Sequence, residues 1–420
     1  MCKSKMAIKA SVPTRRSQSS STATTTKSSS FSNRYTSTSS SSTSSSTTYT
    51  KASTSSSVST LSSLRDSLPE NPHIYDISEI RSATNNFLAK RHNNNSSIAS
   101  WRCTLRGRST VIFQRKFRRK IHTDQLKEML SIICRNHHVS IVKLLGASVS
   151  GDHIYLVYDH VQGANLAECL RNPRNPNFTV LSTWISRMQV AADLAHGLDY
   201  IHNSAGFNLV HNHIKNSSII VTEPHFNARI CHFGTAQLCG EIRDDDKDGD
   251  DGDNENNSSK VNRSDSGITQ FEGVRGYMAP EFMVSGVPSQ KADVYAFGVL
   301  VLELLSGEEP LKYKLDKIRG DYVRTSLIET ARDAIQGGGG GGGGHGRLRT
   351  WVDRRLKDSF PVEVAEKLTR LALECVHSEA DQRPNMGRVV GKISKLYLES
   401  KFWSDNIKIP AGVSVSLAPR

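Results

Sequence analysis

The spacing of apolar residues along the chain divides it into two regions, one with strand-like runs and one with helical periodicity. Before residue 160 the apolar residues form short runs of strand length, with one helical face between them. The strand-like runs cover residues 98–105, 110–117, 141–148 and 153–158, and the helical face carries Leu126, Met129, Leu130 and Ile133. After residue 166 the helical period dominates, at residues 182–202, 293–306 and 362–377. The pattern predicts an α+β fold with two lobes: a small antiparallel β lobe with one helix, and a larger helical lobe.

Four segments lack the periodicity of ordered elements. Residues 17–63 are almost all Ser and Thr, so we expect residues 1–70 to be a disordered basic tail. Ordered sequence begins near His73, where a short strand and a helix capped by Asp76 or Ser78 are predicted. The other three segments are an acidic loop insertion at 240–268, a glycine-rich loop at 336–346 and a C-terminal tail at 401–420.

The acidic insertion has the sequence pattern of a calcium-binding loop but not the flanking features that such a loop requires. Residues 244–255 have the acidic and glycine spacing of an EF-hand loop. Asp251 stands where that loop needs an apolar residue, and neither flank has a helical period. A solvated loop is therefore favoured.

The N-terminal tail leaves three interpretations open. It fits a solvated segment that is open to phosphorylation, and its Ser-rich, acid-free composition also fits a plastid transit peptide. Cys2 beside Lys3 and Lys5 is a candidate for S-palmitoylation, which would give peripheral association with a membrane.

Charge, cysteines and hydropathy exclude several classes of protein. The net charge is +13, but nine basic and no acidic residues lie in residues 1–65, so about +4 remains for the rest. A basic folded surface for nucleic acid is therefore not expected. The seven cysteines are scattered without a CxxC pair, which argues against a disulfide framework or zinc ribbon and suits a reducing compartment. The longest apolar run, residues 294–305, is interrupted by Glu303 and is too short to span a bilayer.

Five motifs follow one another from residue 211. They read "HNHIKNSSIIV", "RICHFGTAQL", "GVRGYMAPEF", "KADVYAFGVLVLELLSG" and "DQRPNM". In order and approximate spacing they resemble the C-lobe of eukaryotic protein kinases. With "SATNNF" and "LVYDHVQGANLAECL", the chain is similar to the plant receptor-like, Pelle-type kinases, most of all their LysM-receptor and cytoplasmic branches. The resemblance covers residues 73–400 and implies a kinase N-lobe at 73–160 and C-lobe at 161–400.

The resemblance implies that the packing residues of the kinase fold are retained. Glu281 and Arg383 match the ion pair that ties the activation segment to the helical lobe, and Asp293 matches the acid that holds the catalytic loop through its backbone. His211 and Phe233 match two members of the apolar stack that joins the lobes, and Gly234 follows them as in the family motif. Retention of these residues predicts that the fold is maintained.

The nucleotide-site positions that the resemblance assigns are degenerate. They fall on Asn93, Asn95, Ile98, Ser100, Ile112, Gln114, Glu128, Tyr158 and His160. None of the three phosphate-loop positions is glycine. Each residue there carries a Cβ, which hinders the close approach of backbone amides to phosphates. Ile112 would crowd the adenine space, and Gln114 replaces the phosphate-binding lysine with Glu128 as its partner acid. Lys116, two residues on, would share a face with Gln114 and is the candidate substitute.

The catalytic and metal positions are altered as well. The acidic base becomes His213, which can accept a proton near pH 7, while Lys215 is retained. The two metal-ligand positions become Ser218 and His232, and neither offers Mg²⁺ an anionic oxygen. The cleft is therefore expected to offer no carboxylate to a divalent ion. A transition-metal site made by His213, His232 and Cys231 is a weaker alternative.

These losses favour a pseudokinase that acts as a scaffold or allosteric partner of an active receptor-like kinase or another signalling protein. The alternative is a weakly active Ser/Thr kinase that uses Lys116, Arg102 or Arg106, with His213 as the base. ATP is implied only at the level of the family, and magnesium is not expected. The expected location is the cytoplasm, including the inner face of the plasma membrane, with plastid targeting as the minority alternative.

The segment from Thr235 to Met278 suggests regulation. Ser264, Ser266 and Thr269 lie there and could receive phosphates that order the loop against Arg275.

Overall fold

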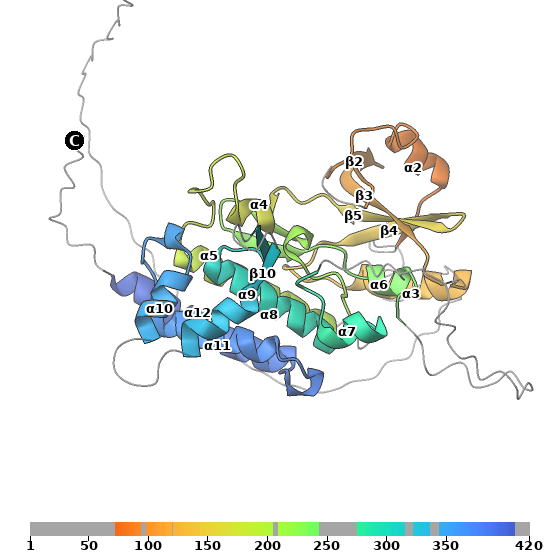
Figure 1. The fold of residues 1–420 in the computed structure, drawn as a ribbon. Helices are drawn as coiled ribbons and strands as arrows, with labels where there is room; N and C mark the ends of the chain where they lie inside the picture. Colours follow the sequence, from red (N-terminus) through yellow and green to blue (C-terminus); the bar gives the residue numbers. More distant parts are fainter. Residues whose placement is uncertain are drawn as a thin grey trace, which may run out of the picture. The chain divides into compact units, whose positions relative to one another are not determined.

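Figure 1 shows the fold of the chain in a computed structural model. The structure describes residues 72–93, 98–119, 121–204, 209–242, 275–315, 322–336 and 344–407. The predictions for Asn95, the N-terminal tail, the acidic run at 244–255, residues 337–343, residues 408–420 and the three candidate phosphorylation sites lie outside these ranges. The C-terminal tail expected at 401–420 is shorter than predicted, because a helix continues to Asn406. The loop expected at 336–346 is also shorter, because one helix ends at Gln336 and the next begins at Gly344. The two predicted lobes are present within the described ranges, so the α+β, two-lobed fold class is confirmed.

The small lobe is built on one five-stranded sheet. Its strands are β1 (His73–Ile74), β2 (Ser100–Leu105), β3 (Arg108–Lys116), β4 (Leu144–Ser150) and β5 (His153–Asp159). They lie in the order β1-β4-β5-β3-β2. All neighbours are antiparallel except β1 and β4, which pair in parallel, so the predicted antiparallel sheet has one parallel edge.

Two helices belong to this lobe, one at the capped segment predicted after His73 and one at the predicted helical face of residues 126–133. The first, α2 (Ile77–Ala83), begins with a capping box in which Asp76 accepts from Ser78 N and Glu79 accepts from Asp76 N. The second, α3 (Thr123–Arg135), buries Leu130 and Ile133. The helices take separate parts of the core: Ile80 of α2 lies in a small apolar cluster with residues of β2, β3 and β5, while the buried side of α3 belongs to the main core.

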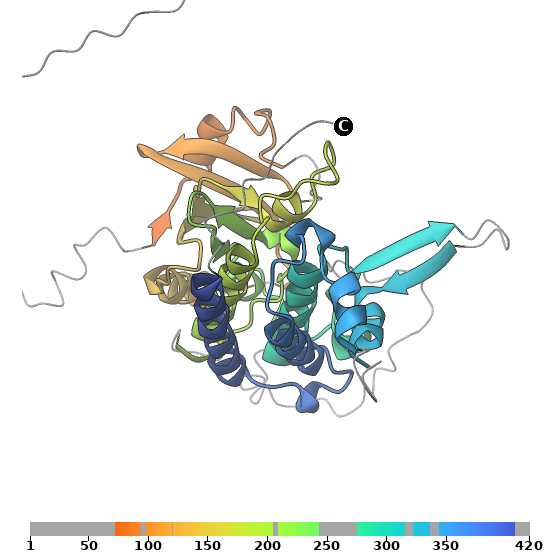
Figure 2. The ribbon, with the colours of Figure 1, turned by 90° about the vertical axis from the view of Figure 1, so that its left-hand side faces the viewer.

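The large lobe packs around α8 (Gln290–Ser306), which is apolar nearly all round and mostly buried. Figures 1 and 2 show it among α5 (Trp184–Asp199), α11 (Val362–Cys375) and α12 (Met386–Asn406). The remaining helices are α4 (Leu166–Leu170), α6 (Thr235–Leu238), α7 (Pro280–Ser285), α9 (Leu327–Gln336) and α10 (Gly344–Trp351). None of the helices in the described ranges is long and apolar enough to cross a bilayer.

Two further sheets complete this lobe. The three-stranded sheet contains β6 (Ala164–Asn165), β7 (Ile219–Thr222) and β8 (Asn227–Ile230), and it carries the loops of the candidate site. A hairpin of β9 (Leu311–Leu315) and β10 (Tyr322–Ser326) projects from the helices (Figure 2).

Candidate functional site

The inner face of β3 brings Phe113 and Arg115 to the candidate site. The Phe113 ring lies edge-on to the His232 ring at 4.5 Å between centroids and to the Tyr158 ring at 5.8 Å. Arg115, two residues on and therefore on the same face, is 5% exposed, and its charge acts on His232 and Glu241. The strand thus directs an aromatic ring and a guanidinium inward.

This arrangement corrects the register expected for β3. Ile112 packs with Ile80, Leu105 and Val157 on the outer face of the sheet. Gln114 shares the outer face with Ile112 because strand side chains alternate. Arg115 therefore lies at the position expected for Gln114, and Phe113 at the position expected for Ile112.

Three other small-lobe candidates are also away from the site. Lys116 forms a surface ion pair with Asp152 at 3.1 Å, and its side chain is 70% exposed, so it cannot replace the missing strand lysine. Glu128 lies on the exposed side of α3 and forms no ion pair among the described residues. Arg106 is bound to Glu79 at 2.8 Å, also outside the cleft.

The segment expected to hold phosphates is only partly described. Asn93 and Ile98 lie on either side of its undescribed centre, and Ser100 is fully buried on the inner face, opposite Phe113. His92 N donates to the Ser100 carbonyl at 2.8 Å.

The Tyr158 side chain, at the end of β5, makes contacts that connect the small lobe to the large lobe. Tyr158 donates its hydroxyl to the Phe233 carbonyl at 2.8 Å and lies 3.1 Å from Thr235 Oγ1. Burial raises the pKa of Tyr158 well above its usual value, so the hydroxyl stays a donor. His160 N donates to the Ser109 carbonyl at 3.1 Å. Tyr158 therefore joins β5 to the start of the activation segment.

The catalytic loop is held by a buried carboxylate of α8. Asp293 accepts from His211 N at 2.6 Å and from Asn212 N at 2.8 Å, and it also contacts His202 Nε2 at 3.1 Å. The His211 ring contacts the Cys231 carbonyl at 2.8 Å. Burial lowers the pKa of His211 to about 4, so this ring is neutral near pH 7.

Glu241 enters the site from the activation segment and was not identified from the sequence. Its Oε1 lies 3.1 Å from His213 Nε2, and its Oε2 accepts from Asn212 Nδ2 at 2.7 Å. The His213 and Glu241 side chains are 6% and 8% exposed. Burial alone would raise the pKa of Glu241, but the hydrogen bond and charge of His213, the Asn212 hydrogen bond and the Arg115 charge hold it at about 2. The structure thus brings a carboxylate beside the catalytic loop that the sequence analysis did not predict, with both of its oxygens already bound.

The segment that carries Glu241 is fixed at several points. Arg118 N donates to the Cys239 carbonyl at 2.8 Å, and Arg119 Nη1 donates to the Ile242 carbonyl at 3.2 Å. On the other side, Gln237 Nε2 donates to the Val210 carbonyl at 2.9 Å. Residues 237–242 thus lie between the end of β3 and the catalytic loop.

His232 and Ser218 occupy the two expected metal positions. Burial, followed by the Arg115 charge, lowers the pKa of His232 well below its usual value, so the ring is neutral. Its Nδ1 is buried and has no hydrogen-bond partner. Ser218 Oγ donates to the Lys215 carbonyl at 2.7 Å and accepts from Lys215 N at 3.0 Å. Among the described residues, no group of three His, Cys, Asp or Glu side chains could hold a metal ion, and the His213–His232–Cys231 alternative is not assembled.

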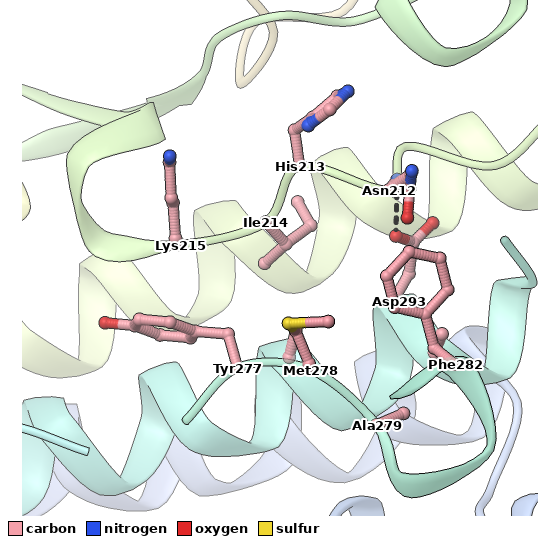
Figure 3. Close-up of a pocket in the computed structure, with 11 residues that line it drawn as sticks. Asn212, His213, Ile214, Lys215, Tyr277, Met278, Ala279, Phe282 and Asp293 are labelled. Carbon is pink, nitrogen blue, oxygen red and sulfur yellow. Dashed lines mark hydrogen bonds between the residues drawn. The ribbon is translucent and has the colours of Figure 1, made fainter. Parts of the chain in front are cut away.

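The activation segment returns beneath the catalytic loop. Figure 3 shows Asn212–Lys215 on one side of a cavity of about 40 Å³ and Tyr277–Ala279 on the other. Beyond it, Arg383 donates to both oxygens of Glu281 at 2.6 and 2.7 Å. Gly234 has a left-handed φ of +83° and lies against Ile133 of α3. The packing residues therefore make the contacts that hold the segment ends.

A magnesium–nucleotide complex does not fit these residues. The adenine side of the cleft is lined by Phe113, and the position of the main metal ligand holds a neutral imidazole. Glu241, the carboxylate that the described residues bring to His213, has both oxygens engaged by Asn212 and His213. Mg²⁺ prefers anionic oxygens in octahedral geometry, and this donor set does not provide them.

Known proteins resemble this chain along most of its described part. Residues 109–392 match the protein kinase domain family. The LysM domain receptor-like kinase 3 of Arabidopsis thaliana is 29% identical over 80% of this chain and 48% of its own length. Proline-rich receptor-like protein kinase PERK8 of the same plant is 32% identical over 69% of this chain and 38% of its own length. The chain spans about half or less of the length of these relatives.

A solved structure shares the fold. The pseudokinase domain of BIR2, described as an immune regulator of the RLK/Pelle family, superimposes with a TM-score of 0.56. It is 21% identical and the match covers 77% of this chain and 86% of that one.

Proposed function

This chain belongs to the protein kinase family, and we propose that it is a catalytically impaired member, a pseudokinase that acts as a scaffold or allosteric partner of an active kinase. The family assignment rests on the match over residues 109–392, and the relatives are plant receptor-like kinases. The observation that carries the proposal is the Glu241 carboxylate, which is bound to His213 and Asn212.

This contact blocks the chemistry expected of the catalytic loop. Phosphoryl transfer depends on a positioned base and on cations that neutralise the phosphate charge. Nε2 of His213 is already paired with Glu241, and an anionic carboxylate there repels a triphosphate. Arg115, the guanidinium of the cleft, also stabilises the Glu241 anion.

A phosphorylation assay on the purified full chain tests the proposal. We expect no incorporation of labelled phosphate from ATP, with Mg²⁺ or Mn²⁺, above that of a His213→Ala variant, which controls for contaminating kinases. We also expect no metal-dependent thermal shift with ATP. Incorporation that the wild-type chain shows and His213→Ala lacks would refute catalytic impairment.

The second candidate function is a weakly active Ser/Thr kinase with relocated groups. It is favoured by Arg115 and Glu241, a cation and a carboxylate that face the cleft where the sequence predicted neither. In that case activity depends on both groups. Arg115→Met and Glu241→Gln would each abolish it, whereas the exposed Lys116→Met would leave it unchanged. If Glu241 instead blocks the site, Glu241→Gln cannot lower activity.

The proposed partner is an active receptor-like kinase or another signalling protein of the cytoplasm, with peripheral membrane association through Cys2 as a further hypothesis. The receptor-like kinase relatives support this class of partner. Such a kinase would phosphorylate Ser264, Ser266 or Thr269 in the activation segment. Mass spectrometry after co-expression with candidate kinases tests this, and unmodified residues in every pairing would count against it.

A further inference from the structure

A second polar cavity lies where the loop after α3 meets β8 and the connection between the lobes. We call it the junction cavity; it has a volume of about 350 Å³, and the lining residues used below are His137, His138, Lys143, Asp159 and Arg229. Its lining contains no residue of the catalytic loop and none of the activation segment. It is therefore separate from the site described above.

The walls of the junction cavity are fixed by backbone hydrogen bonds between the lobes. Val142 N donates to the Ile230 carbonyl at 2.9 Å, and Ile230 N donates to the Ser140 carbonyl at 2.8 Å. Asp159 N donates to the Lys143 carbonyl at 2.9 Å. These backbone hydrogen bonds fix the position of Lys143 in the small lobe relative to β8 in the large lobe. The walls of the cavity are therefore set by the backbone as well as by side chains.

The lining has cations without matching carboxylates. Lys143 and Arg229 are half-buried, and neither forms an ion pair with any described residue. The Lys143 ammonium lies 3.2 Å from His137 Nε2, and Arg229 Nε is buried without a hydrogen-bond partner. The one acid of the lining, Asp159, lies 3.5 Å from the Arg108 guanidinium. An unsatisfied guanidinium N–H and an ammonium in one lining are groups that an anionic ligand would satisfy.

His138 adds an oriented ring to the lining. It stacks on Tyr200 at 5.1 Å between centroids, and its Nδ1 accepts from Ser140 N at 3.1 Å. Nδ1 is thus the acceptor, so the proton of the neutral ring lies on Nε2, which is a donor. Burial, followed by the charge of His196, lowers the pKa of His138, which agrees with a neutral ring.

We propose that the junction cavity binds a phosphate monoester dianion, held by the Arg229 guanidinium and the Lys143 ammonium with His138 as a neutral donor. A guanidinium pairs well with the oxygens of a phosphate, and an ammonium supplies a second charge. The volume exceeds that of phosphate alone, so the cavity has room for the group esterified to it. The bound phosphate would link the loop after α3 to β8 and so hold the small lobe against the large one. The proposal does not depend on whether the chain transfers phosphate.

Calorimetric titration of the full chain at about 0.15 M salt tests the proposal, since exposed charges are screened there. The probes are inorganic phosphate, O-phospho-L-serine, and a peptide that contains one phosphoserine, with L-glutamate as the carboxylate control. Tighter binding of the two esters than of inorganic phosphate identifies an esterified ligand, and a preference for the peptide identifies a modified protein segment as the source. If inorganic phosphate, O-phospho-L-serine and the peptide bind equally tightly, the phosphate group alone accounts for binding. That result would overturn the proposal that the ligand is a phosphate ester.

Three variants decide whether the binding occurs in the junction cavity. We expect Arg229→Gln and Lys143→Gln each to weaken phosphoserine binding by about tenfold or more, because each removes a charge-assisted hydrogen bond. Arg174→Gln, at an exposed arginine that does not line the cavity, should change it by less than about twofold. Lys143→Gln keeps the test decisive if Arg229→Gln fails to fold. Equal binding by all variants, or titrations that do not saturate, would overturn the proposal.

Discussion

Replacement of Glu241 by glutamine tests the buried contact on which the proposed function depends. The substitution keeps the size of the side chain and one oxygen that can accept from Asn212, but it removes the charge that faces His213. Glu241 is 8% exposed and His213 is 6% exposed, so solvent screens this pair far less than a surface pair.

The size of the effect follows from the pKa of Glu241. A fall from 4.5 to about 2 corresponds to about 3 kcal/mol of stabilisation of the folded, ionised form, taken as an upper value. Because glutamine retains part of the hydrogen bonding, we expect Glu241→Gln to lower the free energy of unfolding by about 1–3 kcal/mol at pH 7.

The pH dependence has a defined sign. The folded pKa of Glu241 lies below its unfolded value, so its contribution is complete above about pH 4.5 and is lost as the pH falls towards 2. The wild-type chain and Glu241→Gln should therefore differ by a constant amount from pH 7 to pH 5, and by less below that.

Urea unfolding followed by tryptophan fluorescence at several pH values measures this difference. The matched control is Glu128→Gln, at an exposed glutamate of α3, which should stay within about 0.5 kcal/mol of the wild type. If Glu241→Gln unfolds at the same urea concentration as the wild type at pH 7, or if their difference grows below pH 4.5, the reasoning about this contact is refuted.

Three further predictions concern other parts of the fold. Arg383→Lys should lower the free energy of unfolding by about 2–4 kcal/mol, because lysine cannot make the bidentate contact with Glu281; an unchanged thermal midpoint would contradict this. Phe113→Ala should cost about 2–4 kcal/mol and open the adenine side of the cleft, so a fluorescent adenosine analogue that binds wild type and variant equally would count against the placement of this ring. Burial raises the pKa of Cys231 and Cys375 to about 12, so about one thiol in ten thousand is ionised at pH 8; mass spectrometry should find both unalkylated in the native chain and modified after unfolding.

The large lobe was the part of the fold that the sequence predicted best. Its helices carry apolar residues at helical spacing over many turns. The five motifs lie on or beside these helices in a fixed order, so the position of each motif helps to place the next. The helices expected at 182–202, 293–306 and 362–377 correspond to α5, α8 and α11, with ends that differ by a few residues.

The error in β3 has a physical cause. Residues 110–113 are all buried or nearly so, because the strand is covered on its outer face by the small cluster and on its inner face by the main core. A strand that is buried on both faces loses the alternation that reveals its orientation, and a shift by one residue exchanges the two faces. In addition, the phosphate-loop positions carry no glycine, so no glycine motif was present from which the register of β3 could be counted. Only the ring contacts of Phe113 and the burial of Arg115 decide it.

Glu241 could not be identified for a different reason. It belongs to no motif, and it lies 28 residues from His213 along the chain, so their contact exists only after the activation segment folds back. The contact nevertheless explains how the altered catalytic loop is stable. With histidine at the position of the acidic base, the catalytic loop supplies no carboxylate of its own to the buried Arg115 guanidinium, and a buried cation needs an anion nearby. The chain supplies that anion from its own activation segment. The position of the family's acidic base thus holds a histidine that contacts Glu241, and this buried contact ties the activation segment to the catalytic loop.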